Sequence, residues 1–169
     1  MRDWKYCPKC GSALARSGSG REIRAVCARC GYVKYDNPLP TTIGLVVRGD
    51  RVLLLRRGIE PEFGKWDTVG GFMSGDETAE EGLRREAREE IGLEVDGLSF
   101  VGSFSSVYGD TGLRTIGLAF RCSIADDQVI ELSGENTEYR WFDLGELPDV
   151  AFADVRKALA QLQSARSSG

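Results

Sequence analysis

The 169 residues are enough for one domain with a hydrophobic core, or for such a domain and a small module, and 41% of them are hydrophobic. The net charge of −4 gives the chain no overall attraction for nucleic acids or for anionic membranes. The chain contains no histidine, which excludes Ser–His and Cys–His catalysis and histidine metal sites.

Four of the five cysteines lie in two Cys-x-x-Cys pairs near the N-terminus, each followed by a glycine. Two such pairs place four thiolates around one zinc ion, with glycine leaving room for each turn. Disulfides would need an oxidising compartment, which nothing in the sequence indicates. We therefore expect a zinc ribbon at residues 1–36, in which the metal supplies much of the folding free energy. The Zn²⁺ ligands are Cys7, Cys10, Cys27 and Cys30.

The remaining residues, 37–169, predict one α/β domain that begins in a connector containing two prolines. Two apolar runs separated by Gly49 and Asp50 indicate a β-hairpin whose strands are covered on both faces. Strands mixed with helices on two sides indicate a sandwich around a mixed sheet. The predicted strands cover residues 42–47, 52–55, 66–71, 98–107, 113–124 and 138–143, and the predicted helices cover residues 77–91 and 153–165.

The predicted helix at residues 77–91 has an apolar stripe with acidic residues at the edge of the stripe. Glu86 and Glu90 are four residues apart and so lie on one face, with Glu89 beside them. Two carboxylates on a core-facing edge repel each other and resist burial unless a cation lies between them. Oxygen ligands suit Mg²⁺ or Mn²⁺, which can bind a diphosphate and lower the pKa of a bound water.

The alternative for this helix is a solvent-exposed surface with Arg–Glu ion pairs at i,i+4 spacing. Arg84, Arg85 and Arg88 could supply the positive partners of such pairs. That alternative leaves unexplained both the Gly70-Gly71 turn and the position of the glutamates at the edge of the apolar stripe. We therefore favour a metal site.

The segment from Gly71 to Leu93 resembles the signature of the Nudix hydrolases at every fixed position of that motif. The matching residues are Gly71, Glu77, Arg85, Glu86, Ala87, Glu89, Glu90, Gly92 and Leu93. The resemblance implies an α/β/α Nudix sandwich that hydrolyses the pyrophosphate bond of a nucleoside diphosphate linked to another group.

The same resemblance implies a role for each acidic residue of the motif. Catalytic magnesium would be held by Glu86, Glu89 and Glu90 with help from the Gly71 carbonyl. An ion pair between Glu77 and Arg85 would fix the loop onto the helix. The general base varies within the family, and the candidates here are Glu89, Glu135 and Glu138.

A zinc ribbon before a Nudix domain resembles two groups of enzymes. NADH pyrophosphatases carry a Ser-Gln-Pro-Trp stretch after the motif and a further N-terminal domain, and this sequence shows neither. Residues 35–38, Tyr-Asp-Asn-Pro, resemble the connector of ribbon-bearing enzymes that act on ADP-ribose or FAD. ADP-ribose, FAD or a related dinucleotide is therefore the expected substrate, and NADH is an alternative.

Aromatic and basic residues on either side of the motif are candidates for substrate contacts. An adenine or flavin ring could stack on an aromatic side chain, and an arginine could bind phosphate. For each aromatic alone core packing is the alternative, and for each arginine a solvated surface role. The candidates are Phe63, Trp66, Phe104, Tyr108, Arg56, Arg57 and Arg114.

Two other functions remain open at this stage. The ribbon is basic, so an RNA-cap-removing hydrolase could use it to bind nucleic acid. A non-catalytic ligand sensor on a Nudix fold is the other, although such sensors usually have degraded motifs. The sequence also leaves a homodimer open. Because no apolar run could span a membrane and the N-terminus does not resemble a secretory signal, we expect a cytoplasmic protein.

Overall fold

The computed structural model describes residues 4–19 and 23–166, and the chain forms two compact units. Unit 1 is Met1–Pro38 and unit 2 is Leu39–Gly169, so the break between them lies within the proline-rich connector. In the described part of the chain, no helix is both long and apolar enough to cross a membrane.

The smaller unit contains a three-stranded antiparallel sheet in the order β1-β2-β3. Its strands are β1 (Ala15–Ser17), β2 (Arg24–Val26) and β3 (Val33–Tyr35). The fully buried apolar side chains among its described residues are those of Cys7, Ala25 and Cys27. This core is too small to hold the sheet together by burial alone, so the unit needs a cross-link through its cysteines.

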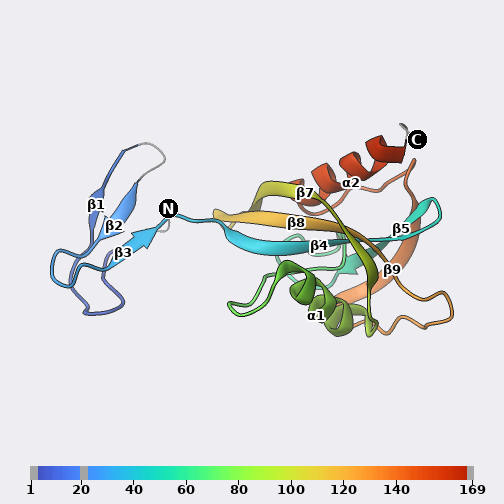
Figure 1. The fold of residues 1–169 in the computed structure, drawn as a ribbon, viewed down its shortest axis with the longest axis horizontal. Coiled ribbons are helices and arrows are strands. Elements are labelled where there is room, and N and C mark those ends of the chain that lie inside the picture. The colour runs from blue at the N-terminus through green and yellow to red at the C-terminus, as the bar shows by residue number, and fades with distance from the viewer. Residues whose placement is uncertain (1–3, 20–22, 167–169) are drawn as a thin grey trace. The chain divides into compact units, whose positions relative to one another are not determined.

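The larger unit is built on a six-stranded mixed sheet that contains the order β6-β5-β4-β8-β7, with β9 paired along the whole length of β5. Only β4 and β8 run parallel, and the other described pairs are antiparallel. The helices α1 and α2 lie on opposite faces of this sheet (Figure 1). The predicted α/β sandwich with a mixed sheet is thus confirmed. The elements are β4 (Leu39–Arg48), β5 (Arg51–Arg57), β6 (Trp66–Asp67), α1 (Ala79–Ile91), β7 (Asp96–Tyr108), β8 (Leu113–Ser123), β9 (Asn136–Asp143) and α2 (Ala153–Arg166).

Strands β4 and β5 are buried on both faces, which explains their continuous apolar runs. Because side chains alternate along a strand, Leu53 and Leu55 of β5 face α1, while Val52 and Leu54 face α2. On the α1 side, they pack with the apolar stripe of the helix, which includes Leu83. The sheet therefore fixes the apolar face of α1 and, with it, the positions of the acidic side chains at the edge of that face.

The strands β4 and β5 separate soon after their hairpin turn, where the paired residues are 47–48 and 51–52. The chain between β6 and α1 enters the gap and bridges back to β4, from Val69 to Gly44 and from Phe72 to Thr41. The strand predicted at residues 66–71 is consequently only two residues long. A Cβ atom at Gly70, whose φ is +142°, would lie 2.2 Å from a backbone oxygen of β4, so only glycine fits this approach.

Candidate active site and metal centre

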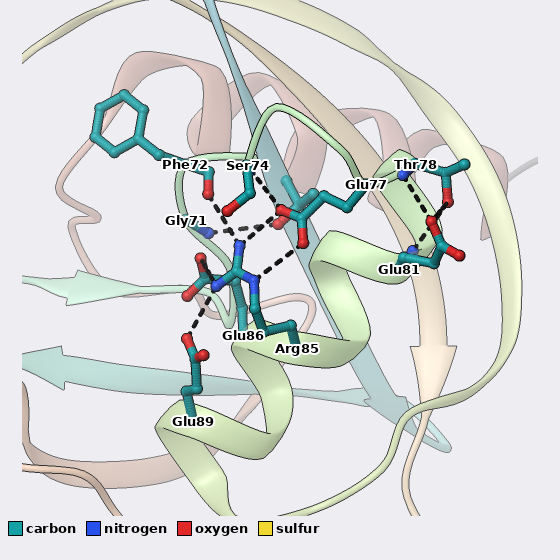
Figure 2. Close-up of polar contacts among 10 residues, drawn as sticks. Gly71, Phe72, Ser74, Glu77, Thr78, Glu81, Arg85, Glu86 and Glu89 are labelled. Atoms are coloured by element: carbon teal, nitrogen blue, oxygen red, sulfur yellow. Dashed lines mark hydrogen bonds and ion pairs between the residues drawn. The ribbon is translucent and has the colours of Figure 1, made fainter.

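Helix α1 begins at Ala79 rather than at the predicted residue 77, because Thr78 caps it. The Thr78 hydroxyl accepts a hydrogen bond from the Glu81 backbone N–H, and the Glu81 carboxylate accepts one from the Thr78 backbone N–H (Figure 2). Gly92, in the left-handed conformation, ends the helix. Glu77 therefore lies before the helix, in the loop, where its side chain is able to reach back across the first turns.

Arg85 connects the loop to the helix, as the sequence motif implied (Figure 2). Its Nε and Nη2 donate to the two oxygens of Glu77 at 3.0 and 2.8 Å, and Nη2 also donates to the Phe72 carbonyl at 3.1 Å. The backbone N–H of Ser74 donates to Glu77 as well, at 2.6 Å. These hydrogen bonds, those from Arg85 above all, lower the pKa of Glu77 to about 2. Glu77 is thus a permanent anion that holds Arg85 and the loop together.

The three glutamates assigned to the metal lie along the same face of α1 with different degrees of burial. Glu89 is exposed, whereas burial raises the pKa of Glu86 and brings the pKa of Glu90 to about 8. Glu90 Oε2 accepts a hydrogen bond from the Gly70 backbone N–H at 2.9 Å. Without a bound cation, this raised pKa favours the protonated form of Glu90 at neutral pH. A cation beside the carboxylate would favour the charged form.

Two of these glutamates, Glu86 and Glu89, already contact a cation, the guanidinium group of Arg85. Its Nη1 lies 2.8 Å from Glu86 Oε1 and 2.9 Å from Glu89 Oε2. A Cβ atom at Gly71 would lie 2.6 Å from Glu86 Oε1, so glycine is what lets the backbone approach this carboxylate. The donor set is all oxygen and suits a hard divalent cation, which would replace the contacts from Nη1.

These side chains line a cavity of about 320 Å³, a volume suited to part of a nucleotide. The carboxylates and Gly71 form one part of its wall. Aromatic rings, threonines, two further aspartates and Arg57 form the rest. The wall includes Glu86, Glu89, Glu90, Glu135, Gly71, Phe72, Tyr108, Phe152, Arg57, Asp67, Asp154, Thr68 and Thr115.

Of the residues predicted to touch substrate, Tyr108 and Arg57 line this cavity, and so does the candidate base Glu135. Trp66 instead packs edge-on against Phe142 at 4.8 Å, and Phe104 packs against the core beneath α2. The others lie outside the described wall of the cavity. Phe63 is 62% exposed, Arg114 does not line the cavity, and Glu138 pairs with Arg56 and Arg140.

Sequence reasoning missed several residues of the wall, among them Phe72, Asp67, Phe152 and Asp154. Phe72 follows Gly71 in the motif, so its position beside the metal loop could have been found. Asp67 is largely buried beside Arg57, and burial raises its pKa to about 6. Phe152 immediately precedes α2 and Asp154 lies in its first turn, and no motif in the sequence connects them with residues 71–93.

The four cysteines of the smaller unit form the one described group whose ligand atoms all lie within 4.8 Å of one another. The Sγ atoms of Cys7 and Cys30 are 3.6 Å apart, and those of Cys10 and Cys27 are 3.5 Å apart. Four sulfurs at about 2.3 Å from one zinc ion would be separated by roughly 3.8 Å. The cysteines therefore fit a tetrahedral zinc ion with little movement.

Comparison with known proteins gives a family match for each of the two units. The model of the NUDIX domain matches residues 38–162, and the model of the Nudix N-terminal zinc ribbon matches residues 5–36. The NAD-capped RNA hydrolase NudC of Pseudomonas aeruginosa is 32% identical over 168 residues, which are 98% of this chain and 57% of that protein. The chain thus spans less than two thirds of the length of such relatives.

Solved structures give the same result for the fold. A Nudix hydrolase from Nitrosomonas europaea is 27% identical with a TM-score of 0.76, covering 98% of this chain and 93% of that one. The Nudix domain of Shewanella oneidensis NrtR, solved with ADP ribose, is 18% identical with a TM-score of 0.63. It covers 77% of this chain and 89% of that one, and at this identity it shows the fold alone. The resemblance inferred from residues 71–93 is confirmed.

Proposed function

Because the chain belongs to the Nudix hydrolase family, we propose that it hydrolyses the pyrophosphate bond of a nucleoside diphosphate derivative with the help of Mg²⁺ or Mn²⁺. One observation carries the proposal: a single cavity joins the glutamates of α1 to a cluster of aromatic rings. The glutamates can hold a metal ion against a diphosphate, and the aromatic rings can hold the planar group attached to that diphosphate.

Glu86, Glu89 and Glu90, with the Gly71 carbonyl, would hold the cation, which supplies charge neutralisation of the diphosphate and an acidified water when bound. Arg85 and Glu77 are positioning residues, because they fix the loop that carries Gly71 and Phe72 against the helix. Glu89 and Glu135 both line the cavity, and either carboxylate can take the proton of the attacking water.

For the substrate, we propose ADP-ribose, FAD or a related adenine dinucleotide. The connector at residues 35–38 supports this class, as does a cavity with both aromatic and polar walls. A second candidate is NAD-capped RNA, because relatives 32% identical to the chain are NAD-capped RNA hydrolases.

The smaller unit supports the RNA candidate through its exposed side chains. Tyr6 is 67% and Tyr35 is 54% exposed, and both are flat surfaces on which bases can stack. Basic residues lie among them. Those within the described residues are Lys5, Lys9, Arg16, Arg24, Arg29 and Lys34, whereas Arg2 and Arg21 lie outside the described residues.

The direct test is turnover by the full chain with magnesium and a panel of substrates: ADP-ribose, FAD, NADH, nucleoside triphosphates and NAD-capped RNA. We expect AMP among the products of ADP-ribose or FAD. If all substrates remain intact, the proposed hydrolysis is wrong, and binding of ADP-ribose without turnover would identify a ligand sensor instead.

The RNA candidate has its own test within the full chain. Replacing Lys5 and Lys9 with glutamate should raise KM for NAD-capped RNA, with a smaller effect at high salt, and leave KM for ADP-ribose unchanged. The double variant Arg51→Glu with Arg121→Glu, at exposed positions of β5 and β8, is the charge-matched control. An equal KM for capped RNA in all three proteins would remove the ribbon from substrate binding.

A further inference from the structure

Arg57, in the wall of the cavity, carries a nitrogen that the protein leaves without a hydrogen bond. Its Nε donates to the Pro61 carbonyl at 2.9 Å, and its Nη1 contacts Asp67 at 3.2 Å. The guanidinium group also lies over the ring of Phe152, 4.9 Å from the ring centre. Nη2 is buried and has no hydrogen-bond partner among the described residues. A bound ligand with an acceptor atom would satisfy this donor.

Next to Arg57, three aromatic rings form a continuous cluster. Tyr108 stacks on Phe152 with 5.1 Å between the ring centres and 19° between the planes. Phe72, which follows the metal loop, meets Tyr108 edge-on at 5.1 Å. All three rings line the cavity, so a planar heterocycle can pack against this cluster while a diphosphate attached to it extends toward the glutamates.

Asp154 supplies a buried acceptor in the same wall. Its Oδ1 accepts the Val155 backbone N–H at 3.1 Å, and a Cβ atom at Gly117 would lie 3.1 Å from Oδ2, so glycine makes room for this carboxylate. Both oxygens of Asp67 already accept hydrogen bonds from the protein, one from Arg57 and one from the Thr68 backbone. Asp154 is therefore the better acceptor for a ligand.

The charges of this wall exclude a phosphate as its ligand. Two aspartates and one arginine leave an excess of negative charge, which repels an anion in a buried site. Beside a flat apolar surface, this wall offers a buried donor without a partner, on Arg57, and a buried acceptor, on Asp154. The complementary ligand is a flat ring with an amino group beside an acceptor atom.

We propose that this part of the cavity is a nucleobase pocket that selects adenine through its amino group. The exocyclic amino group donates to Asp154, the adjacent ring nitrogen accepts from Arg57, and the ring packs on the Phe72–Tyr108–Phe152 cluster. This inference rests on the proposed function, whose substrates share an adenine. Hypoxanthine, with a carbonyl in place of the amino group, faces Asp154 with an acceptor and is rejected.

The test compares the equilibrium binding of AMP and IMP to the full chain by calorimetry. The two nucleotides differ at the position that meets Asp154 and have the same phosphate, so their ratio reports on the base. We expect AMP to bind about 10- to 100-fold more tightly than IMP. In Asp154→Asn, the amide can donate to the carbonyl of IMP, so the AMP/IMP ratio should fall at least tenfold. Asp127→Asn, at an exposed loop position, should keep the wild-type ratio.

The nicotinamide carboxamide carries the same pair of amino group and acceptor, so nicotinamide and nicotinate mononucleotides form the second arm. Discrimination in this arm, lost in Asp154→Asn and absent with AMP and IMP, would show that nicotinamide occupies the pocket. Equal binding within both pairs, or ratios that Asp154→Asn does not change, would overturn the inference. Turnover is measured separately: selective binding without hydrolysis contradicts only the proposed function, and hydrolysis without selectivity contradicts only the pocket.

Discussion

The two groups of metal-ligating side chains differ in how completely the protein assembles them. The four cysteines lie together, with every ligand atom within 4.8 Å of the others. The glutamates of α1 instead contact protein donors, Glu86 and Glu89 through Arg85 and Glu90 through the Gly70 backbone. A cation can enter the first group with little movement, whereas in the second it must displace Arg85.

The difference follows from local structure. Each cysteine pair lies in a tight turn that glycine closes, with Gly11 donating to the Cys7 carbonyl and Gly31 to the Cys27 carbonyl, both at 2.9 Å. The turns fix the sulfurs. The glutamates project from a helix into a cavity on longer side chains that can change rotamer. A closed tetrahedral site suits a permanent structural metal, and an open carboxylate site suits a cation that is shared with substrate.

The largest effect should come from breaking the cysteine group. Cys27 is 1% exposed, and Cys27→Ser removes one of the four ligands in a unit with almost no other core. Zinc binding by such small domains is worth about 10–16 kcal/mol, so we expect bound zinc to fall from one per chain to none and β1–β3 to unfold. Atomic emission measures the zinc content, and the NMR amide signals of residues 5–36 report whether the strands are folded.

The matched control is Cys122→Ser, which changes a buried thiol of the larger unit. It should keep one zinc per chain, because Cys122 lies in β8 rather than in the cysteine group. If Cys27→Ser retained its zinc, the cysteine group would not be the ligand set, and the contrast between the two sites would fail.

A smaller effect should follow from weakening the glutamate group. Glu89→Gln keeps the shape of an exposed side chain and removes one charge from the cation site, so folding should be unaffected. A bound metal is worth several kcal/mol of transition-state stabilisation, and we expect kcat/KM for ADP-ribose to fall by roughly 10²- to 10³-fold. Glu80→Gln, exposed on the same helix, should retain wild-type turnover. Equal turnover in the two variants would contradict the assignment of Glu89.

The Glu77→Gln variant tests whether Arg85 competes with the cation for Glu86 and Glu89. Glu77 takes two of the hydrogen bonds that Arg85 donates, and without its charge Arg85 is freer to stay on Glu86 and Glu89. We expect the magnesium concentration at half-maximal rate to rise about tenfold, with a smaller change in the rate at saturating magnesium. A fall in the saturated rate with no change in magnesium dependence would show that the ion pair acts only on the loop.

The sequence predicted the parts of the molecule that depend on short-range patterns. The two Cys-x-x-Cys pairs, the hairpin around Gly49 and the acidic edge of α1 repeat at spacings set by turns, strands and helices. The Glu77–Arg85 ion pair was expected from the family resemblance and is present in the structure. These features are encoded within about 25 residues of chain.

Short-range sequence patterns could not predict which residues form the walls of the cavity. Phe152 immediately precedes α2 and Asp154 lies in its first turn, and α2 lies on the opposite side of the sheet from the metal motif. Only the separation of β4 and β5 brings the two sides to one cavity, and that depends on how residues 69–72 pair with β4. Trp66 and Phe104 were candidates for substrate contact with core packing as the alternative, and both pack against the core.

The smallest effect should come from the cap of α1, which supports the glutamate group without touching it. Thr78→Ala removes one half of the capping box and should lower the free energy of unfolding of the larger unit by about 1 kcal/mol. Ser99→Ala, an exposed hydroxyl on β7, should change it by less than about 0.5 kcal/mol. Hydrogen bonds from the Thr78 backbone N–H and hydroxyl lower the pKa of Glu81, so the stabilisation from them is present above the ordinary glutamate pKa of about 4.3 and is lost as the pH falls below it. Thr78→Ala keeps the backbone bond and removes the hydroxyl's bond, so denaturant unfolding should show a difference from the wild type that is largest near pH 7 and narrows in acid. A difference that did not depend on pH would mean that the Thr78 hydroxyl does not stabilise the charged form of Glu81.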